Sequence, residues 1–172
     1  EKLGGHKPAG PLRGGKYSLY DAGTRVPFIT FWKGKINPSV SAALVSQLDL
    51  FSSLAALAGS RQTTPDSRNL LDVFLGKSRQ GRDDLIVEAT SKTAFRKGDW
   101  AMIPPYKGPA VQNQVNIELG NSKEYQLFNI KEDPGQQNNL AATDTVRLKE
   151  MIAEYEKIRG NGAQNIEQLE LK

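Results

Sequence analysis

The chain contains no cysteine, one histidine and two methionines. The absence of cysteine excludes disulfides, thiolate metal sites and a cysteine nucleophile, and it leaves the redox compartment open. Long apolar runs are also missing, because serine, glutamine and aspartate interrupt the longest candidate, residues 42–58, so the sequence predicts no membrane span. No stripe of one charge sign is present, since 23 Lys and Arg are scattered among 19 Asp and Glu. A nucleic-acid-binding surface would be more clustered, and we expect neither nucleic acid nor membrane as a partner.

The composition that remains is ordinary for a soluble globular protein, with 38% hydrophobic and 24% charged residues. A length of 172 residues suffices for one compact domain, or for a small domain plus a piece of another. The chain begins at Glu1 without a start methionine or a signal-peptide pattern. We interpret it as a processed or truncated product.

The first half combines a loop with two apolar segments. Six glycines and two prolines within residues 1–23 predict an ordered loop. Residues 25–32 are rich in β-branched and aromatic side chains, which favours a buried strand. Residues 40–58, followed by Gly59, show the three-and-four spacing of an amphipathic helix; alternatively a shorter helix begins at Asp49 as its cap.

The second half predicts an antiparallel sheet closed by a helix. Short strand-like runs are separated by turn signals, at residues 85–89, 93–96, 100–103 and 125–130. We expect residues 104–120 to be a surface excursion, the segment between Asp144 and Gly160 to be an amphipathic helix over one face of the sheet, and residues 161–172 to be frayed.

Arg13-Gly14-Gly15-Lys16 is the most informative stretch for chemistry. Glycines let the backbone approach a ligand, and a lysine delivered from such a loop can neutralise an anionic oxygen. The alternative is that Lys16 is a solvated lysine, because one basic loop that fits neither phosphate-loop pattern is weak evidence. Arg13 either strengthens the anion-binding field or pairs with a carboxylate and holds the loop. His6 either contacts substrate or is a surface residue.

Four colinear blocks resemble the sulfatase family. Residues 12–27 are similar to its second signature region, an L-R-x-G-K core followed by Tyr-x-x-Gly-x-Arg-x-Pro. Residues 49–59 resemble its Asp-Leu-x-x-Thr-Leu-x-x-Leu-Ala-Gly helix, and residues 95–100 its Arg-x-Gly-x-Trp hairpin. Residues 125–140 are similar to its closing strand and Asp-Pro-x-Glu-x-x-Asn-Leu turn. The blocks span nearly the whole chain in the family's order.

The resemblance implies the C-terminal part of an α/β, alkaline-phosphatase-like sulfatase fold. Residues 1–80 would give the large mixed sheet a strand, a helix and the active-site loop, and residues 81–172 would form a small antiparallel-sheet subdomain with a terminal helix. Lys16 would bind the sulfate, with His6 and Arg13 as further substrate-binding candidates.

The rest of the catalytic machinery implied by the resemblance is not found in this sequence. The nucleophile, a formylglycine made in a C/S-x-P-x-R motif, has no counterpart, since residues 64–68 do not match it. The family's calcium ligands are absent too, so we expect no metal ligand here, and the missing N-terminal catalytic portion becomes the expected partner. The chain alone is predicted to be inactive.

The resemblance also implies the substrate class, a sulfated small molecule or glycan, and favours a periplasmic or extracellular location. Two alternatives remain open from the sequence: a phosphomonoester or phosphonate ester hydrolase of the same superfamily, and a non-catalytic module that holds sulfated polyanions. We expect Arg25 to be structural, paired with Asp21, and Asp49 to be a helix cap and not a ligand.

Overall fold

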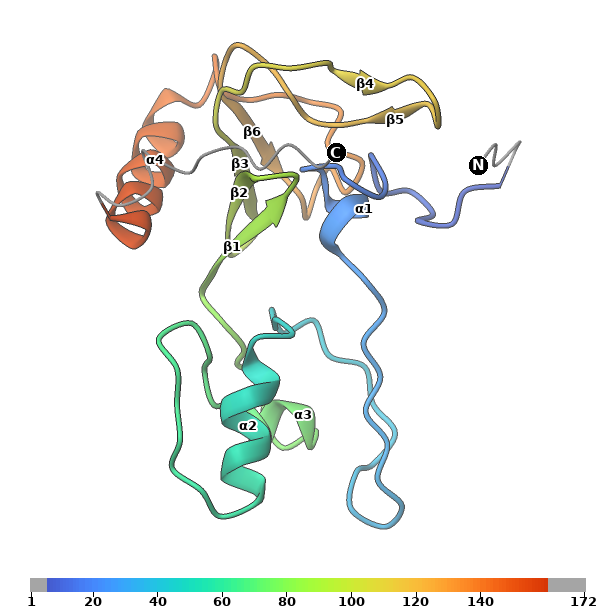
Figure 1. Cartoon of the computed structure of the whole chain (residues 1–172), viewed down its shortest axis with the longest axis vertical. Helices are drawn as coiled ribbons and strands as arrows, with labels where there is room; N and C mark the ends of the chain where they lie inside the picture. The colour runs from blue at the N-terminus through green and yellow to red at the C-terminus, as the bar shows by residue number, and fades with distance from the viewer. Residues whose placement is uncertain (1–5, 161–172) are drawn as a thin grey trace, which may run out of the picture. The chain divides into compact units, whose positions relative to one another are not determined.

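The computed structural model describes residues 6–160 and divides the chain into two compact units (Figure 1). Unit 1 combines residues 1–26 with residues 86–172, and unit 2 is residues 27–85. The predicted frayed tail, residues 161–172, lies outside the described residues. The predicted domain division after residue 80 refers to the complete protein and stays a prediction.

Unit 1 is built on a four-stranded sheet whose order is β1-β2-β3-β6. Its strands are β1 (Asp84–Ala89), β2 (Lys92–Lys97), β3 (Trp100–Ile103) and β6 (Gln126–Asn129). Thr90 and Ser91 join β1 to β2 with φ values of 52° and 62°, the geometry of a tight hairpin turn. The four predicted strands and the antiparallel pairing of β2 with β3 and of β3 with β6 are confirmed.

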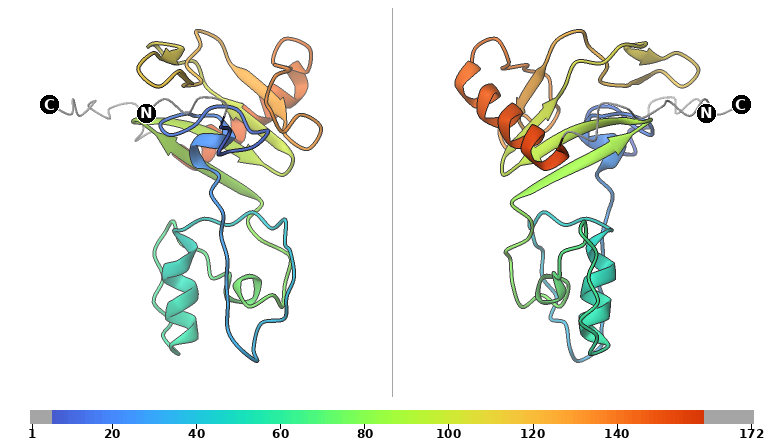
Figure 2. Two further views of the ribbon diagram at one scale, coloured as in Figure 1. Left: turned by 90° about the vertical axis from the view of Figure 1, so that its right-hand side faces the viewer. Right: turned by 60° about the vertical axis from the view of Figure 1, so that its left-hand side comes forward.

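One face of this sheet is covered by α4 (Thr145–Arg159), as Figure 2 shows. Phe95, Met102 and Leu127 stand opposite one another in the register of β2, β3 and β6, and all three are fully buried. They pack with Met151 and Tyr155 of α4. Asp144 accepts a hydrogen bond from the third residue of the helix, 3.0 Å away, so it caps the start of α4 as its residue type favours. The predicted terminal helix is confirmed.

The other face of the sheet is buried by the N-terminal loop. Ala101 and Phe128, also neighbours in register, point away from α4 and pack with Leu19 and Tyr20. The loop continues into a short helix, α1 (Asp21–Thr24). A second, two-stranded sheet formed by β4 (Val111–Gln112) and β5 (Ile117–Glu118) lies within the predicted surface excursion. The glycine-rich loop is therefore part of the core of unit 1.

Unit 2 contains α2 (Asp49–Leu57) and α3 (Leu71–Phe74). The helix predicted for residues 40–58 is wrong over residues 40–48, and the shorter helix is confirmed. The cap role predicted for Asp49 is wrong, because Leu48 occupies the cap position and Asp49 is the first helical residue. Asp49 is fully buried and its carboxylate accepts the N–H groups of Ser46 and Arg68, each 2.9 Å away. These bonds tie the start of α2 to the segments at Ser46 and Arg68. Gly59 ends it with a φ of 79°.

The buried strand predicted for residues 25–32 is wrong for this chain. These residues form no strand after Thr24, and Ile29 and Phe31 are each 87% exposed. Phe28 packs on Phe74, with ring centroids 5.2 Å apart. The apolar pattern is genuine, but a strand needs a neighbour for its N–H and C=O groups, and none of residues 6–160 pairs with this segment. Among the same residues no helix is long and apolar enough to cross a membrane.

Candidate anion-binding loop

Lys16 lies on the exposed side of the loop formed by residues 12–24. Its ammonium is 5.0 Å from the centre of the Tyr17 ring, and no carboxylate among residues 6–160 forms an ion pair with it. Tyr17 has a φ of 77°, a left-handed conformation that costs a non-glycine residue on the order of 1–3 kcal/mol and that is frequent at ligand sites. An unneutralised cation beside a strained residue is a candidate anion-binding group.

The loop is tightly folded on itself. Gly14 has a φ of 85°, and the N–H of Ser18 donates to the carbonyl of Gly15 at 2.9 Å. Gly23 lies against the same turn, because a Cβ at this position would stand 2.1 Å from the carbonyl oxygen of Ser18. Only glycine fits such a close approach of two backbone segments. The glycines thus fix the path of the loop around Lys16.

Arg13 attaches the start of the loop to the C-terminal part of unit 1. Its guanidinium donates to both carboxylate oxygens of Glu118 on β5, at 2.9 Å and 2.6 Å, and to the backbone carbonyl of Gln136 at 2.7 Å. It also stacks 4.2 Å from the centre of the Tyr20 ring. The hydrogen bond from Arg13 lowers the pKa of Glu118 below its ordinary value, and the same bond raises the pKa of Arg13. Both groups are therefore charged at neutral pH, and each neutralises the other.

The centre of the loop is held by backbone and side-chain bonds to β5, to the residue that follows it and to β6. The hydroxyl of Ser18, which is fully buried, donates to the backbone carbonyl of Glu118 at 2.6 Å. The N–H of Leu19 donates to the carbonyl of Leu119 at 3.0 Å. The hydroxyl of Tyr20 donates to the side-chain oxygen of Gln126 on β6 at 2.7 Å. These contacts surround Lys16 in sequence without involving its side chain.

Gln136 and Asp21 hold the end of the loop. The buried side chain of Gln136 accepts the backbone N–H of Asp21 at 2.8 Å, although Gln136 itself has a φ of 48°. The carboxylate of Asp21 lies 3.4 Å from the guanidinium of Arg96 and 3.8 Å from that of Arg25. The predicted pairing of Arg25 with Asp21 is confirmed. Burial lowers the pKa of Arg96, which opposes the effect of the nearby Asp21 carboxylate.

The three predicted substrate-binding residues are thus placed differently. Lys16 is exposed and unpaired within residues 6–160, whereas Arg13 is engaged by Glu118 and Gln136. His6 is exposed, and no hydrogen bond or ion pair joins it to Lys16 or Arg13. Their roles toward a substrate remain predictions. The attaching residues Glu118 and Gln136 were missed because their partners lie more than 100 positions away along the chain.

Asp49 is the first residue of α2 and not its cap, and its side chain anchors the helix in unit 2. Its carboxylate receives the guanidinium of Arg82, with Nε at 3.0 Å and 2.8 Å from the two oxygens, in addition to the two backbone N–H groups. Burial raises the pKa of Asp49, but these hydrogen bonds outweigh it and the pKa is lowered overall. All of the strong acceptor positions of Asp49 are used within unit 2, which leaves it no role as a metal ligand.

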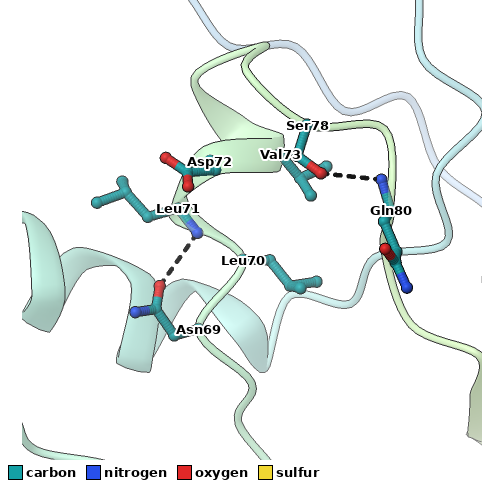
Figure 3. Close-up of a pocket in the computed structure, with 7 residues that line it drawn as sticks. All are labelled: Asn69, Leu70, Leu71, Asp72, Val73, Ser78 and Gln80. Carbon is teal, nitrogen blue, oxygen red and sulfur yellow. Dashed lines mark hydrogen bonds between the residues drawn. The ribbon is translucent and has the colours of Figure 1, made fainter.

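Unit 2 contains a surface cavity of about 340 Å³ (Figure 3). It is lined by the segment around α3, and its polar groups are engaged locally: Asn69 accepts the N–H of Leu71, and Ser78 accepts the N–H of Gln80, both at 3.1 Å. Asp72 is the one titratable group in its lining. Lys16, Arg13 and His6 take no part in it. This cavity is a packing feature of the α3 turn.

Metal ligands do not cluster in the described part of the chain. Residues 6–160 bring no three side chains of His, Cys, Asp or Glu together in a way that could hold a metal ion. The described residues therefore do not by themselves form a site for the calcium ion that the resemblance implies.

Comparisons with known proteins agree with the four sequence blocks. The family model described as Sulfatase matches residues 3–60, the segment that carries the Lys16 loop and α2. An N-acetylgalactosamine-6-O-sulfatase of Bacteroides thetaiotaomicron is 39% identical over 92% of this chain. The chain belongs to the sulfatase family. The resemblance seen in the sequence is confirmed. The match extends to animal proteins, since 77% of this chain aligns with human arylsulfatase A at 31% identity.

The three-dimensional comparison confirms the fold class. A solved structure described as part of glycosaminoglycan metabolism by Bacteroides thetaiotaomicron is similar over 91% of the chain, with 38% identity and a TM-score of 0.85. The chain has the mixed α/β, alkaline-phosphatase-like sulfatase fold. It spans about a third of the length of the relatives it matches, namely 32% of the bacterial sulfatase and 29% of arylsulfatase A.

Proposed function

We propose that this chain supplies the sulfate-binding cation, Lys16, of an enzyme that hydrolyses sulfate esters of carbohydrates. The proposal rests on which cations of residues 12–25 are paired with carboxylates. Arg13 and Arg25 are paired with carboxylates, whereas Lys16 is exposed and has no ion-pair partner among residues 6–160. A fixed positive charge of this kind stabilises the negative charge on sulfate oxygens as the ester bond breaks.

Support for a carbohydrate substrate comes from the relatives. The bacterial relative that is 39% identical is named an N-acetylgalactosamine-6-O-sulfatase, and the similar solved structure belongs to glycosaminoglycan metabolism. The Lys16 loop lies within residues 3–60, which the Sulfatase family model matches. We therefore place the substrate in the class of sulfated sugars.

Lys16 is one part of the proposed site. The formylglycine nucleophile expected for the family would lie outside this chain, because the sequence has no C/S-x-P-x-R motif. The calcium ligands would lie there too, because residues 6–160 hold no metal-binding cluster. When bound, the calcium ion would supply further positive charge to the sulfate. The side chain of Lys16 would bind and orient one sulfate oxygen, and the isolated chain would show no turnover.

The test is to assay the full-length enzyme that carries this chain with an aryl sulfate and an aryl phosphate side by side. We expect turnover of the sulfate ester, and we expect Lys16→Ala to lower kcat/KM by roughly 10²- to 10³-fold, the usual effect of removing one group that stabilises transition-state charge. Lys7→Ala is the matched control, because Lys7 is also an exposed lysine on the N-terminal segment. Preferential turnover of the phosphate, or equal activity of Lys16→Ala and Lys7→Ala, would contradict the proposal.

A further inference from the structure

We infer that Arg13, Glu118 and Gln136 form a clasp, here called the loop clasp, whose role is to position Lys16 for sulfate. This inference rests on the proposed function of Lys16. It assigns a function to two segments of unit 1: the two-stranded β4–β5 sheet and the turn at Gln136 hold the loop of Lys16 in place. Its residues act through Lys16 and are positioning residues.

The first argument is that the clasp uses directional bonds. The Arg13 fork makes two hydrogen bonds to the Glu118 carboxylate and a third to the carbonyl of Gln136. A bidentate arginine-carboxylate pair fixes both distance and orientation, which a lysine at the same position would not. With 21% of the Arg13 side chain exposed, the pair is partly shielded from water. The start of the loop is therefore fixed three residues before Lys16.

The second argument is that the clasp closes on both sides of Lys16. Gln136 accepts from Arg13 through its backbone and from the N–H of Asp21 through its side chain. One buried residue thus ties together two points of the loop, one before and one after Lys16. Gln136 does so in a left-handed conformation, and such strain persists where the surroundings hold it in place.

The third argument concerns charge. Residues 12–20 carry two cations, Arg13 and Lys16. Glu118 neutralises Arg13, so Lys16 is the one cation of this segment that has no ion-pair partner among residues 6–160. A sulfate oxygen would then be attracted to one defined point. Breaking the clasp would release the loop that holds this point in place.

The experiment measures the inhibition constant of inorganic sulfate for the full-length enzyme and its variants. Glu118→Gln keeps the shape of the side chain and removes its charge, and we expect it to weaken sulfate binding by about tenfold, in line with the cost of displacing a positioned group. The matched control is Glu154→Gln. Glu154 forms a similarly half-exposed ion pair with Lys97, but on the α4 side of the sheet, opposite the loop. This control is expected to change sulfate affinity less than about twofold.

A double-mutant cycle separates positioning from general stability. If Glu118 acts through Lys16, adding Glu118→Gln to Lys16→Ala produces no further loss of sulfate affinity. The inference is overturned if Glu118→Gln leaves sulfate affinity unchanged while Lys16→Ala lowers it, or if the loss persists at full size in the Lys16→Ala background. If Lys16→Ala itself leaves sulfate affinity unchanged, the proposed function fails, and the inference fails with it.

Discussion

Gly23→Ala is the change that most directly tests whether the fold of the loop matters for function. A Cβ at residue 23 would lie 2.1 Å from the carbonyl oxygen of Ser18 and 2.8 Å from that of Gly15, both backbone atoms. Ordinary van der Waals contact begins near 3.4 Å, so the backbone must shift by more than 1 Å to admit the methyl group. Lys16 lies between these two carbonyls in sequence and would move with them.

The expected result follows from that shift. A displacement of roughly 1 Å at a group that binds the reacting part of a substrate can cost about 10²-fold in rate, so we expect a loss of this size in kcat/KM of the full-length enzyme. The control is Gly98→Ala in the β2–β3 turn, where a Cβ meets nothing within 4 Å and the cost is the left-handed φ of 53°. That strain is about 1–2 kcal/mol of stability. Kinetics of Gly98→Ala should be close to wild type.

The assay is initial-rate kinetics with an aryl sulfate at a temperature where circular dichroism shows both variants to be folded. Wild-type kcat/KM in Gly23→Ala would refute the argument that the closely packed turn sets the position of Lys16. An equal loss in Gly98→Ala would refute it as well, because the effect would then be one of general stability.

Three further predictions follow from the same contacts. Asp49→Ala leaves a buried arginine without its partner and should lower the free energy of unfolding by about 3–5 kcal/mol in urea titration, whereas exposed Asp83→Ala should stay within about 0.5 kcal/mol. Folding lowers the pKa of Glu118, so the ionised carboxylate stabilises the folded state. Because this side chain is 46% exposed, the contribution is about 1 kcal/mol at most. It is complete above the ordinary pKa of a glutamate and is lost as the pH falls through the lowered pKa of Glu118 in the folded protein. The stability difference between wild type and Glu118→Gln should shrink on acidification through that range, and a constant difference would contradict the assignment. The isolated chain should self-associate in sedimentation experiments, because the apolar side chains of Ile29 and Phe31 are each 87% exposed. The double variant Ile29→Lys and Phe31→Lys should self-associate less.

The sequence predicted those elements whose signals are local. Alternating side chains and tight turns predicted β1, β2, β3 and β6, and the spacing of apolar residues predicted α4, because both patterns act over a few neighbouring positions. The same patterns failed for residues 25–32, where apolar character indicated burial. A strand also requires a partner, and no residue of the described chain supplies one.

The candidate site was predicted in part for the same physical reason. Lys16 could be identified because glycines beside a lysine are a local signal, and the family resemblance strengthened it. Arg13 was left with two roles, since nothing nearby in sequence indicates whether its partner is a carboxylate or a ligand. Glu118 and Gln136 could not be found, because the bonds that connect them to Arg13 join segments separated by 105 and 123 positions.

The most direct measurement is a crystal structure of the full-length enzyme with sulfate bound. The account predicts that the Lys16 ammonium lies within hydrogen-bond distance, about 2.7–3.2 Å, of a sulfate oxygen, with Arg13 still paired to Glu118. A sulfate held in the catalytic site with Lys16 turned toward solvent, or with Arg13 released from Glu118 to bind the anion in its place, would contradict it.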